Sequence, residues 1–364
     1  MRSNDPERKP GPIELNRYVA TATAPAGIPT FMRWPVALTP EDLIAGEVDV
    51  AAIGAPIDLT LARRGAAFGP LGLRTAEQYL PAGPGGNLAF QHSHVGVRPW
   101  EVLKCVDYGD AGVNPFSVEE TQAEVYKRVR EIAETGTFPI ILGGDHSLMR
   151  PDGMAIADVY GHGKVGIVHF DAHYDAAGPI LGNPYSNGTM LRNFIEEGYI
   201  PGENFVQIGL RGWLPADGEM DWMGSQGIKS HYMAEVERDG FEKVMNRAIA
   251  EALDGPEYIF ISFDVDSMDP AYAPGTGSPE PNGLTSREVF PMMRRLCAEC
   301  NVVGMELVEV APMLDPGFTT AFNGLRIIQE AITGLAMRKL GKTEPHYLDP
   351  RTSGQDPVPG QRND

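Results

Sequence analysis

The sequence predicts an α/β protein in which helices cover both faces of a parallel sheet. Short apolar segments recur along the chain, and most of them lack the polar alternation of a strand that is exposed on one face. Amphipathic helical segments alternate with these strands, which is the order expected for a parallel sheet with crossover helices. Because no internal repeat and no linker divides the core, we expect one three-layer α/β/α sandwich.

Six segments have the composition of buried strands. In chain order they span residues 48–55 (VDVAAIGA), 138–142 (FPIIL), 165–170 (VGIVHF), 204–210 (NFVQIGL), 258–263 (YIFISF) and 302–310 (VVGMELVEV). The first of them contains only one glycine, Gly54, where a dinucleotide-binding fingerprint needs three, so we interpret Gly54 as a packing position.

Three segments have helical spacing and alternate with the strands. They span residues 118–135, 241–253 and 286–299. In the first, Val125, Val129 and Ile132 fall near one face at intervals of three or four residues. The third contains Pro291 near its first turns, where a proline disturbs a helix least.

Composition and charge exclude several classes of protein. The chain has 364 residues, of which 42% are hydrophobic and 22% are charged, as in folded globular proteins. Lys and Arg total 30 against 49 Asp and Glu, giving a net charge of −19. This charge disfavours binding to nucleic acid or to an anionic membrane, and it is compatible with a cationic substrate.

Three cysteines, an odd number, argue against the disulfide framework of a secreted protein. Cys297 and Cys300 form a C-x-x-C pair without further zinc ligands at suitable spacing, so we interpret them as residues of a helix. The N-terminus has no apolar signal region, and no apolar segment approaches the roughly 18 residues of a membrane span. We therefore expect a cytoplasmic protein.

The two ends of the chain differ in composition from the rest. Residues 1–35 are rich in Pro, Ala and Thr, and residues 341–364 are polar and rich in proline. We expect an N-terminal arm at 1–35, one catalytic domain at 36–338 and a polar C-terminal tail at 341–364.

Three of the expected strands end in clusters of polar residues, at the edge where open α/β sheets bind their ligands. The clusters are GGDHS (143–147), DAHYD (171–175) and DVDSMDP (264–270). Side chains two residues apart beyond a strand point to the same side, so Asp171, His173 and Asp175 can converge, as can Asp264 and Asp266. The candidate metal ligands are His146, Asp171, His173, Asp175, Asp264 and Asp266.

These residue types together indicate a binuclear metal site. Several carboxylates in one place repel one another, and bound cations remove that repulsion. Carboxylates with two imidazoles suit Mn²⁺ or Ni²⁺ better than a tetrahedral thiolate zinc site does. Each cluster alone is compatible with a simple strand-end turn, whereas the three together favour two metal ions that share and activate a water molecule.

The three motifs, GGDHS, HFDAHYD and SFDVDSMDPAYAPGTGSPEPNGL, resemble those of the ureohydrolase family, which includes arginase, agmatinase, guanidinobutyrase and formiminoglutamase. Weaker agmatinase-like stretches occur at 64–74, 207–212 and 304–312, and the resemblance extends over about residues 30–338. It implies an arginase-like three-layer sandwich. It also implies a trimer or hexamer, with a paralogous subunit as a possible partner.

On the family's pattern, two divalent ions, Mn²⁺ or Ni²⁺, occupy the site. His146, Asp171, Asp175 and Asp264 bind one ion, and Asp171, His173, Asp264 and Asp266 bind the other. A bridging hydroxide attacks the guanidinium carbon of a small cationic substrate, releasing urea and an amine. The resemblance makes Asp175 the residue that passes a proton to the leaving nitrogen and Glu309 the residue that binds the guanidinium; it also counts the ligand His173 among the catalytic residues.

One position departs from the family's pattern. Asn187 occupies the place where relatives close to agmatinase have a histidine, and an amide does not titrate near neutral pH. We interpret Asn187 as the mark of a changed substrate, with a neutral exchange in an Asn-Gly turn as the alternative.

The expected pocket wall at 176–188 contains no Arg or Lys to bind a substrate carboxylate. Trp213 is a further pocket candidate because its ring can bind a cation, although simple packing is an alternative. These features favour an N-alkylated guanidine or a biguanide such as metformin, while agmatine and guanidino acids stay open.

Two other functions are considered, and His169 has two interpretations. A deacetylase-like amidohydrolase shares the general fold but uses one zinc ion, and the intact set of six ligands argues against it. A non-catalytic subunit that requires a partner is supported only by Asn187. Finally, His169 lies two residues before the metal loop, where it either orients an aspartate or is a buried histidine without a role.

Overall fold

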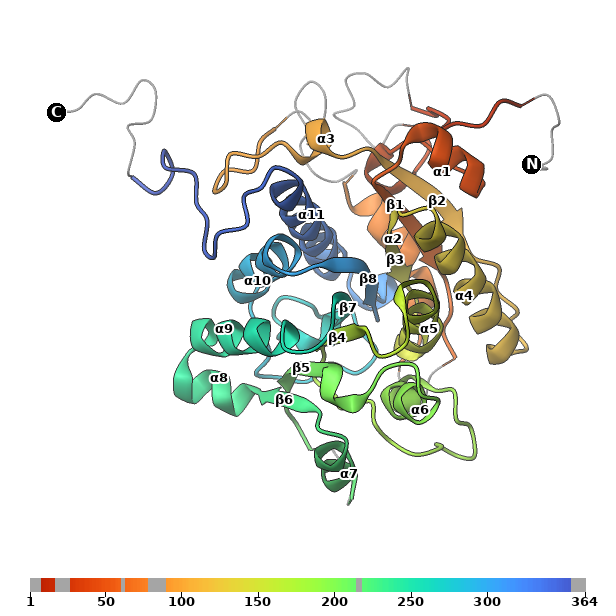
Figure 1. The fold of residues 1–364 in the computed structure, drawn as a ribbon. Coiled ribbons are helices and arrows are strands. Elements are labelled where there is room, and N and C mark those ends of the chain that lie inside the picture. The colour runs from red at the N-terminus through yellow and green to blue at the C-terminus, as the bar shows by residue number, and fades with distance from the viewer. Residues whose placement is uncertain (1–7, 17–26, 60–62, 78–89, 214–217, 355–364) are drawn as a thin grey trace.

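The computed structural model describes residues 8–16, 27–59, 63–77, 90–213 and 218–354. Within them, eight parallel strands form one sheet in the order β2-β1-β3-β8-β7-β4-β5-β6, with helices on both faces (Figure 1). The predicted α/β class and the parallel sheet are confirmed. In the part of the chain that the structure describes, every helix is too short or too polar to cross a membrane.

The six expected strands are present and form the interior of the sheet. They are β1 (Val50–Ala55), β3 (Phe138–Gly143), β4 (Val165–Phe170), β5 (Phe205–Leu210), β7 (Tyr258–Asp264) and β8 (Val302–Val308). Almost every residue in them is buried, because helices cover both faces. Continuous apolar runs are therefore the pattern that this sheet requires.

Two strands were missed from the sequence, and both lie at the edges of the sheet. They are β2 (Cys105–Asp110) and β6 (Lys229–Tyr232). An edge strand has one neighbour and is partly exposed, so its sequence mixes apolar and polar residues. Because β2 contains Asp107 and Asp110 and β6 contains His231, neither segment has the continuous apolar pattern that predicted the other strands.

The helices belong to two layers. The α-helices are α1 (Pro40–Gly46), α2 (Gly69–Ala76), α3 (Pro99–Val102), α4 (Val118–Glu134), α5 (Met149–Tyr160), α6 (Met190–Glu196), α7 (Glu219–Ser225), α8 (Met233–Asp239), α9 (Phe241–Ala252), α10 (Ser286–Glu299) and α11 (Thr319–Lys339). The three expected helices correspond to α4, α9 and α10, and Pro291 lies inside α10. Ser117 caps the N-terminus of α4, because its hydroxyl accepts the Glu120 N–H.

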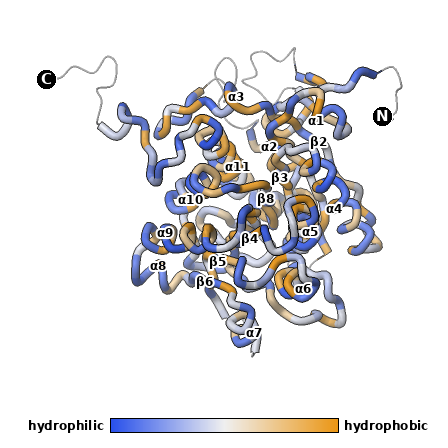
Figure 2. The backbone as a smooth tube through the Cα atoms, viewed as in Figure 1, coloured by the Kyte–Doolittle hydropathy of each residue, from blue (hydrophilic) through white to orange (hydrophobic). Residues whose placement is uncertain are grey.

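Two hydrophobic cores hold the layers to the sheet. One core joins α2, α8, α9, α10 and α11 to one face, and the other joins α1, α4, α5, α6 and α7 to the opposite face. Figure 2 shows the apolar residues of the chain gathered along the strands and along the sides of the helices that face them. Short 3-10 helices follow several strands, and three border the site: η5 (His146–Leu148), η6 (Asn187–Thr189) and η8 (Val265–Ser267).

Parts of both chain ends contact the sheet domain. Ile13 forms an antiparallel bridge with Val36, and Arg8 forms an ion pair with Asp42. Near the other end, the Asp349 N–H donates to the carbonyl of His94. Residues 1–7, 17–26 and 355–364 of the expected arm and tail lie outside the described residues, and the domain boundaries stay a prediction.

A buried ion pair joins α2 to the edge strand β2. Arg74 Nε lies 2.8 Å from Asp107 Oδ2, and Arg74 Nη1 lies 2.6 Å from Asp110 Oδ1. Burial opposes the charge of Arg74, but Asp107 and Asp110 outweigh it and raise the Arg74 pKa. A Cβ at Gly54 would come within 1.8 Å of Asp110 Oδ1, so a side chain here would displace Asp110 from Arg74, which agrees with the interpretation of Gly54 as a packing position.

We expect Arg74→Met to lower the free energy of unfolding by about 3–5 kcal/mol, because it leaves the buried Asp107 carboxylate without its cation. Thermal or urea unfolding of the metal-free protein measures this change. Arg98→Ala is the matched control, because Arg98 pairs with Glu101 at the surface, where such a pair contributes at most about 0.5 kcal/mol. Equal losses in the two variants would contradict the prediction.

Candidate metal centre

The three polar clusters meet at the carboxyl edge of the sheet. η5 follows β3, the DAHYD loop follows β4, and η8 follows β7. β4 and β7 are neighbours, and β8 alone separates β7 from β3. Because parallel strands end at the same edge, clusters far apart in the sequence become adjacent, as the sequence predicted.

The GGDHS loop is held close to the end of β1. A Cβ at Gly144 would lie 2.1 Å from the Ile57 carbonyl oxygen and 2.7 Å from the Ala55 carbonyl oxygen, so only glycine allows this approach. The next residue, Asp145, is fully buried and accepts the backbone N–H groups of Leu59 and Ser147. These contacts fix the backbone that presents His146.

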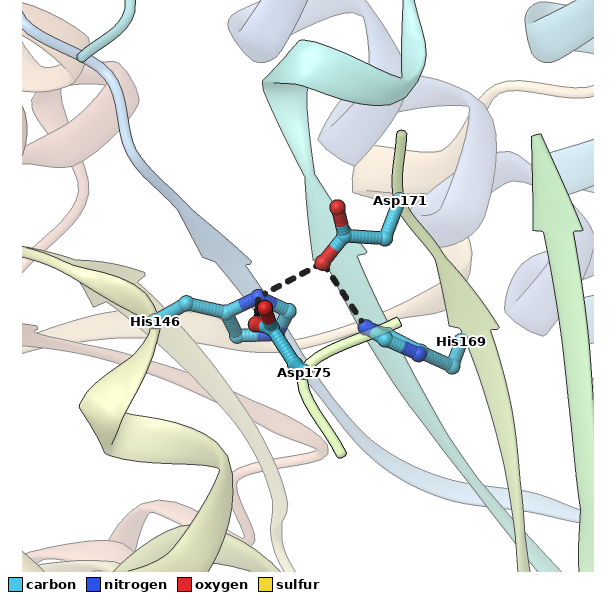
Figure 3. A group of neighbouring side chains, drawn as sticks. All are labelled: His146, His169, Asp171 and Asp175. Carbon is cyan, nitrogen blue, oxygen red and sulfur yellow. Dashed lines mark hydrogen bonds and ion pairs between the residues drawn. The ribbon is translucent and has the colours of Figure 1, made fainter. Parts of the chain in front are cut away.

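His146 is surrounded by carboxylates. Its Nδ1 lies 3.0 Å from Asp171 Oδ2, 3.0 Å from Asp175 Oδ2 and 3.3 Å from Asp264 Oδ2. Figure 3 shows the ring of His146 facing Asp171 and Asp175. This buried nitrogen has no well-formed hydrogen bond among the described residues. A nitrogen lone pair that faces three carboxylates is an arrangement that a divalent cation completes.

A second group of ligand atoms adjoins the first. His173 Nδ1 lies 2.9 Å from Asp266 Oδ2 and 3.3 Å from Asp171 Oδ1. Asp171 therefore directs one oxygen toward His146 and the other toward His173. The backbone N–H of Asp266 donates to Asp264 Oδ1 at 2.8 Å, so the side chain of Asp264 caps η8 and fixes the start of the segment that carries Asp266.

His169 belongs to the same cluster. Its Nε2 lies 3.0 Å from Asp171 Oδ2 (Figure 3). Its Nδ1 lies 3.1 Å from Gln207 Nε2. Of the two sequence interpretations of His169, the geometry favours the one in which it orients an aspartate. The sequence analysis did not identify Gln207 as a neighbour of the site. Its signal in the sequence was a polar side chain in the middle of an otherwise apolar strand.

The electrostatics of the cluster favour bound cations. Burial raises the pKa of Asp264 well above its ordinary value, and the charges of Asp266 and Asp171 raise it further. Burial opposes a charge on His173, but Asp266 and Asp171 outweigh this and raise the His173 pKa to about 12. The site therefore retains protons unless another cation takes their place.

Glu309 lies beside the same cluster. Its Oε1 accepts the His146 backbone N–H at 3.0 Å, and its own N–H donates to the Gly144 carbonyl. Glu309 and Asp175 both have positive φ angles, 62° and 51°, which are uncommon for residues other than glycine. Such backbone strain is concentrated at functional sites in proteins.

Asn187 borders the cluster, whereas Trp213 does not pack in it. Asn187 is half-buried in η6, which packs against η5. The Leu191 N–H donates to the Asp175 carbonyl at 3.1 Å, so the Asn187 turn is connected to a candidate ligand. The Trp213 side chain is 97% exposed and packs in no core, and its role in a substrate pocket stays a prediction.

The donor set fits two divalent ions. Ligand atoms lie within 4.8 Å of one another in two groups, His146/His169/Asp171/Asp175 and Asp171/His173/Asp266. All donors in both groups are carboxylate oxygens or imidazole nitrogens. Cys105, Cys297 and Cys300 are free, and the last two are buried. Cys297 lies in α10, as the interpretation of the C-x-x-C pair as helix residues expected, whereas Cys300 follows the end of α10 in extended backbone, so that interpretation was wrong for Cys300.

Comparisons with known proteins agree with the motifs and the geometry. A model of the arginase family matches residues 48–334. The mitochondrial agmatinase of Gallus gallus is 35% identical over 309 residues, which cover 85% of this chain and 86% of that protein. The guanidinopropionase of Pseudomonas aeruginosa is 35% identical over 337 residues, which cover 92% of this chain and 98% of that protein.

A solved structure has the same fold. The N114H variant of Trypanosoma cruzi formiminoglutamase, solved with Mn²⁺, matches with a TM-score of 0.71 and 26% identity, and the match covers 80% of this chain and 94% of that chain. The resemblance inferred from the motifs and the expected arginase-like sandwich are both confirmed. The chain belongs to the arginase family.

Proposed function

We propose that this amidinohydrolase of the arginase family uses two divalent metal ions to hydrolyse a C–N bond of a small guanidino compound, releasing urea and an amine. The observation that carries the proposal is the arrangement of three carboxylates around His146 Nδ1, next to the pair of His173 and Asp266. Two of its relatives are named agmatinase and guanidinopropionase, which supports a guanidino substrate.

We assign the ligands on the family's pattern. His146 and Asp175 would hold one ion, His173 and Asp266 would hold the other, and Asp171 and Asp264 would bind both. When bound, two such ions lower the pKa of a shared water and supply the hydroxide that attacks the guanidinium carbon. Mn²⁺ and Ni²⁺ both suit these ligands, and the Mn²⁺ of the formiminoglutamase relative supports the former.

Two carboxyl groups of the chain would serve the substrate. Glu309 is almost fully buried, and burial together with the charge of Asp145 raises its pKa well above the ordinary value. A planar guanidinium offers paired N–H donors that would displace the proton and stabilise the carboxylate form. Asp175, which lies against His146, would accept a proton from the attacking water and transfer it to the leaving nitrogen, so that the amine departs neutral.

The Asn187 turn would contact the substituent of the guanidino group. η6 packs against η5 and is connected to the Asp175 backbone, so a change at Asn187 acts beside the reacting carbon rather than far from it. The absence of Arg and Lys from 176–188 supports a substituent without a carboxylate, such as an alkyl group. Assembly as a trimer or hexamer, alone or with a paralogous subunit, stays a prediction from the resemblance.

Urea release tests the proposal directly. We expect the purified protein, loaded separately with Mn²⁺ and Ni²⁺, to release urea from at least one of arginine, agmatine, guanidinobutyrate, guanidine, dimethylguanidine and metformin. The productive compound and the more active metal would define the substrate class and the cofactor. Two bound ions per chain without urea from any compound would contradict the proposal.

We expect Asp264→Asn to remove the stabilisation by metal without destabilising the metal-free protein. Because the folded-state pKa of Asp264 is raised, its carboxylate opposes folding at neutral pH, and a neutral amide relieves this. In the wild type, Mn²⁺ at about 100 times its dissociation constant should add about 2.7 kcal/mol of stability. Melting temperatures with and without Mn²⁺ measure both effects, and an undiminished metal-induced rise in the variant would argue against Asp264 as a ligand.

We expect Asn187→His to change the relative rates on the panel by about two- to tenfold, because one hydrogen bond to a substituent contributes about 0.5–1.5 kcal/mol. The ratio of kcat/KM between agmatine and the N-alkylated compounds is the measurement. Asn301→His is the control, because Asn301 is an exposed asparagine directly before β8 and lies outside the 176–188 segment. If the two variants gave the same ratios as the wild type, Asn187 would have no role in specificity.

A further inference from the structure

A row of polar side chains crosses the sheet directly beneath the metal centre. Strand register aligns His169 of β4 with Ser262 of β7, and Ser262 with Glu306 of β8. On the other side, His169 is aligned with Gln207 of β5. His169 and Ser262 precede the ligands Asp171 and Asp264 by two residues, so the row lies on the same face of the sheet, about 6.6 Å below the ligands.

Ser262 and Glu306 lie behind the ring of His146. The Nδ1 atom of this ring faces the carboxylates of the metal centre, and the opposite atom, Nε2, lies 2.8 Å from Ser262 Oγ. Glu306 Oε1 lies 3.9 Å from the same Nε2. A histidine that binds a metal through one nitrogen carries its proton on the other, and the acceptor of that proton fixes the orientation of the ring.

A second acid, Asp152, completes this arrangement from the helix layer. It lies on α5, the helix that continues from η5 and packs over β4, β7 and β8. Asp152 and Glu306 are both fully buried, and among the described residues none of their four carboxyl oxygens has a hydrogen-bond partner. Two adjacent buried carboxyl groups without a donor or a cation require a proton between them.

The two acids differ in what surrounds them. Glu306 faces His146 Nε2 at 3.9 Å and is the strand neighbour of Ser262, so groups that can donate a proton lie beside its carboxyl group. Asp152 lies on α5 and has no hydrogen-bond donor beside it among the described residues. This arrangement places the shared proton on Asp152, with Glu306 as its acceptor.

We propose that Asp152 and Glu306 are positioning residues that, through Ser262, fix the ring of His146 for metal binding. In the proposed arrangement the Nε2–H of His146 donates to Ser262 Oγ, the Ser262 hydroxyl turns toward Glu306, its neighbour in strand register, and Asp152 and Glu306 share one proton. Each donor in this series of groups faces one acceptor, and Nδ1 of His146 keeps its lone pair for the ion. The inference rests on the metal centre proposed above and names a support for one of its two ions.

Metal binding by the metal-free protein tests the inference. Mn²⁺ titration followed by electron paramagnetic resonance distinguishes a coupled pair of ions from a single ion. We expect Glu306→Gln and Asp152→Leu to weaken the ion held by His146 by about 10- to 100-fold, the usual cost of losing such a partner. The ion held by His173 and Asp266 should bind as in the wild type, so the variants should show a single-ion spectrum at concentrations that fill both sites in the wild type.

Two further variants make the test specific. Asp152→Asn keeps the size of the side chain and an N–H donor toward Glu306, and it should retain the coupled spectrum, whereas Asp152→Leu, which has a similar size and no donor, should lose it. Asp42→Asn changes a fully buried carboxyl in α1, where it binds Arg8 and the Gly11 N–H, and should leave both ions unaffected.

Wild-type binding of both ions by Glu306→Gln would overturn the inference, as would equal weakening of the two ions in parallel with a lower melting temperature of the metal-free protein. Because the readout is binding, absence of urea release would count against the proposed function and not against this inference.

Discussion

The burial of several carboxylates at one edge of the sheet is the constraint on which the rest of the structure depends. Asp171, Asp175, Asp264 and Asp266 are largely withdrawn from water, and carboxylates in such a place repel one another strongly. Three histidines, His146, His169 and His173, face them. The fold therefore holds together a group of charges that would separate if the backbone were free to move, and cations are what such a group binds.

Rigid backbone contacts maintain this arrangement. Gly144 allows the loop after β3 to approach the end of β1 at a distance that no side chain permits, and Asp175 and Glu309 adopt left-handed conformations beside it. The strain at these positions is offset by the two hydrophobic cores, which bury nearly the whole length of the interior strands. Stability is thus supplied far from the site, and the site itself is formed at the expense of local stability.

Much of this was predictable from the sequence, for a physical reason. Interior parallel strands are apolar on both faces, so their sequences stand out as apolar runs. The site lies at the carboxyl ends of these strands, so the polar clusters that follow the runs predicted the ligands. The edge strands β2 and β6 were not predicted, because partial exposure removes the apolar signal. The row of Gln207, Ser262 and Glu306 was also missed. The role of a single polar residue in an apolar strand can be inferred only when the strand register shows which side chains lie beside it.

The candidate ligands and the Asn187 turn differ in how the fold holds them. The ligands and Glu309 lie at or just beyond the ends of β3, β4, β7 and β8, which are adjacent strands that cannot shift without breaking the sheet. The turn at Asn187 lies further along the connection between β4 and α6 that also carries Asp171, His173 and Asp175, and two backbone hydrogen bonds, from Ala177 to Gly188 and from Leu191 to Asp175, tie it to the metal loop. Under the role that we propose for Asn187, a substitution there would change what surrounds the substituent of a substrate while the metal ligands keep their positions. Loops carried by a rigid scaffold allow this kind of change.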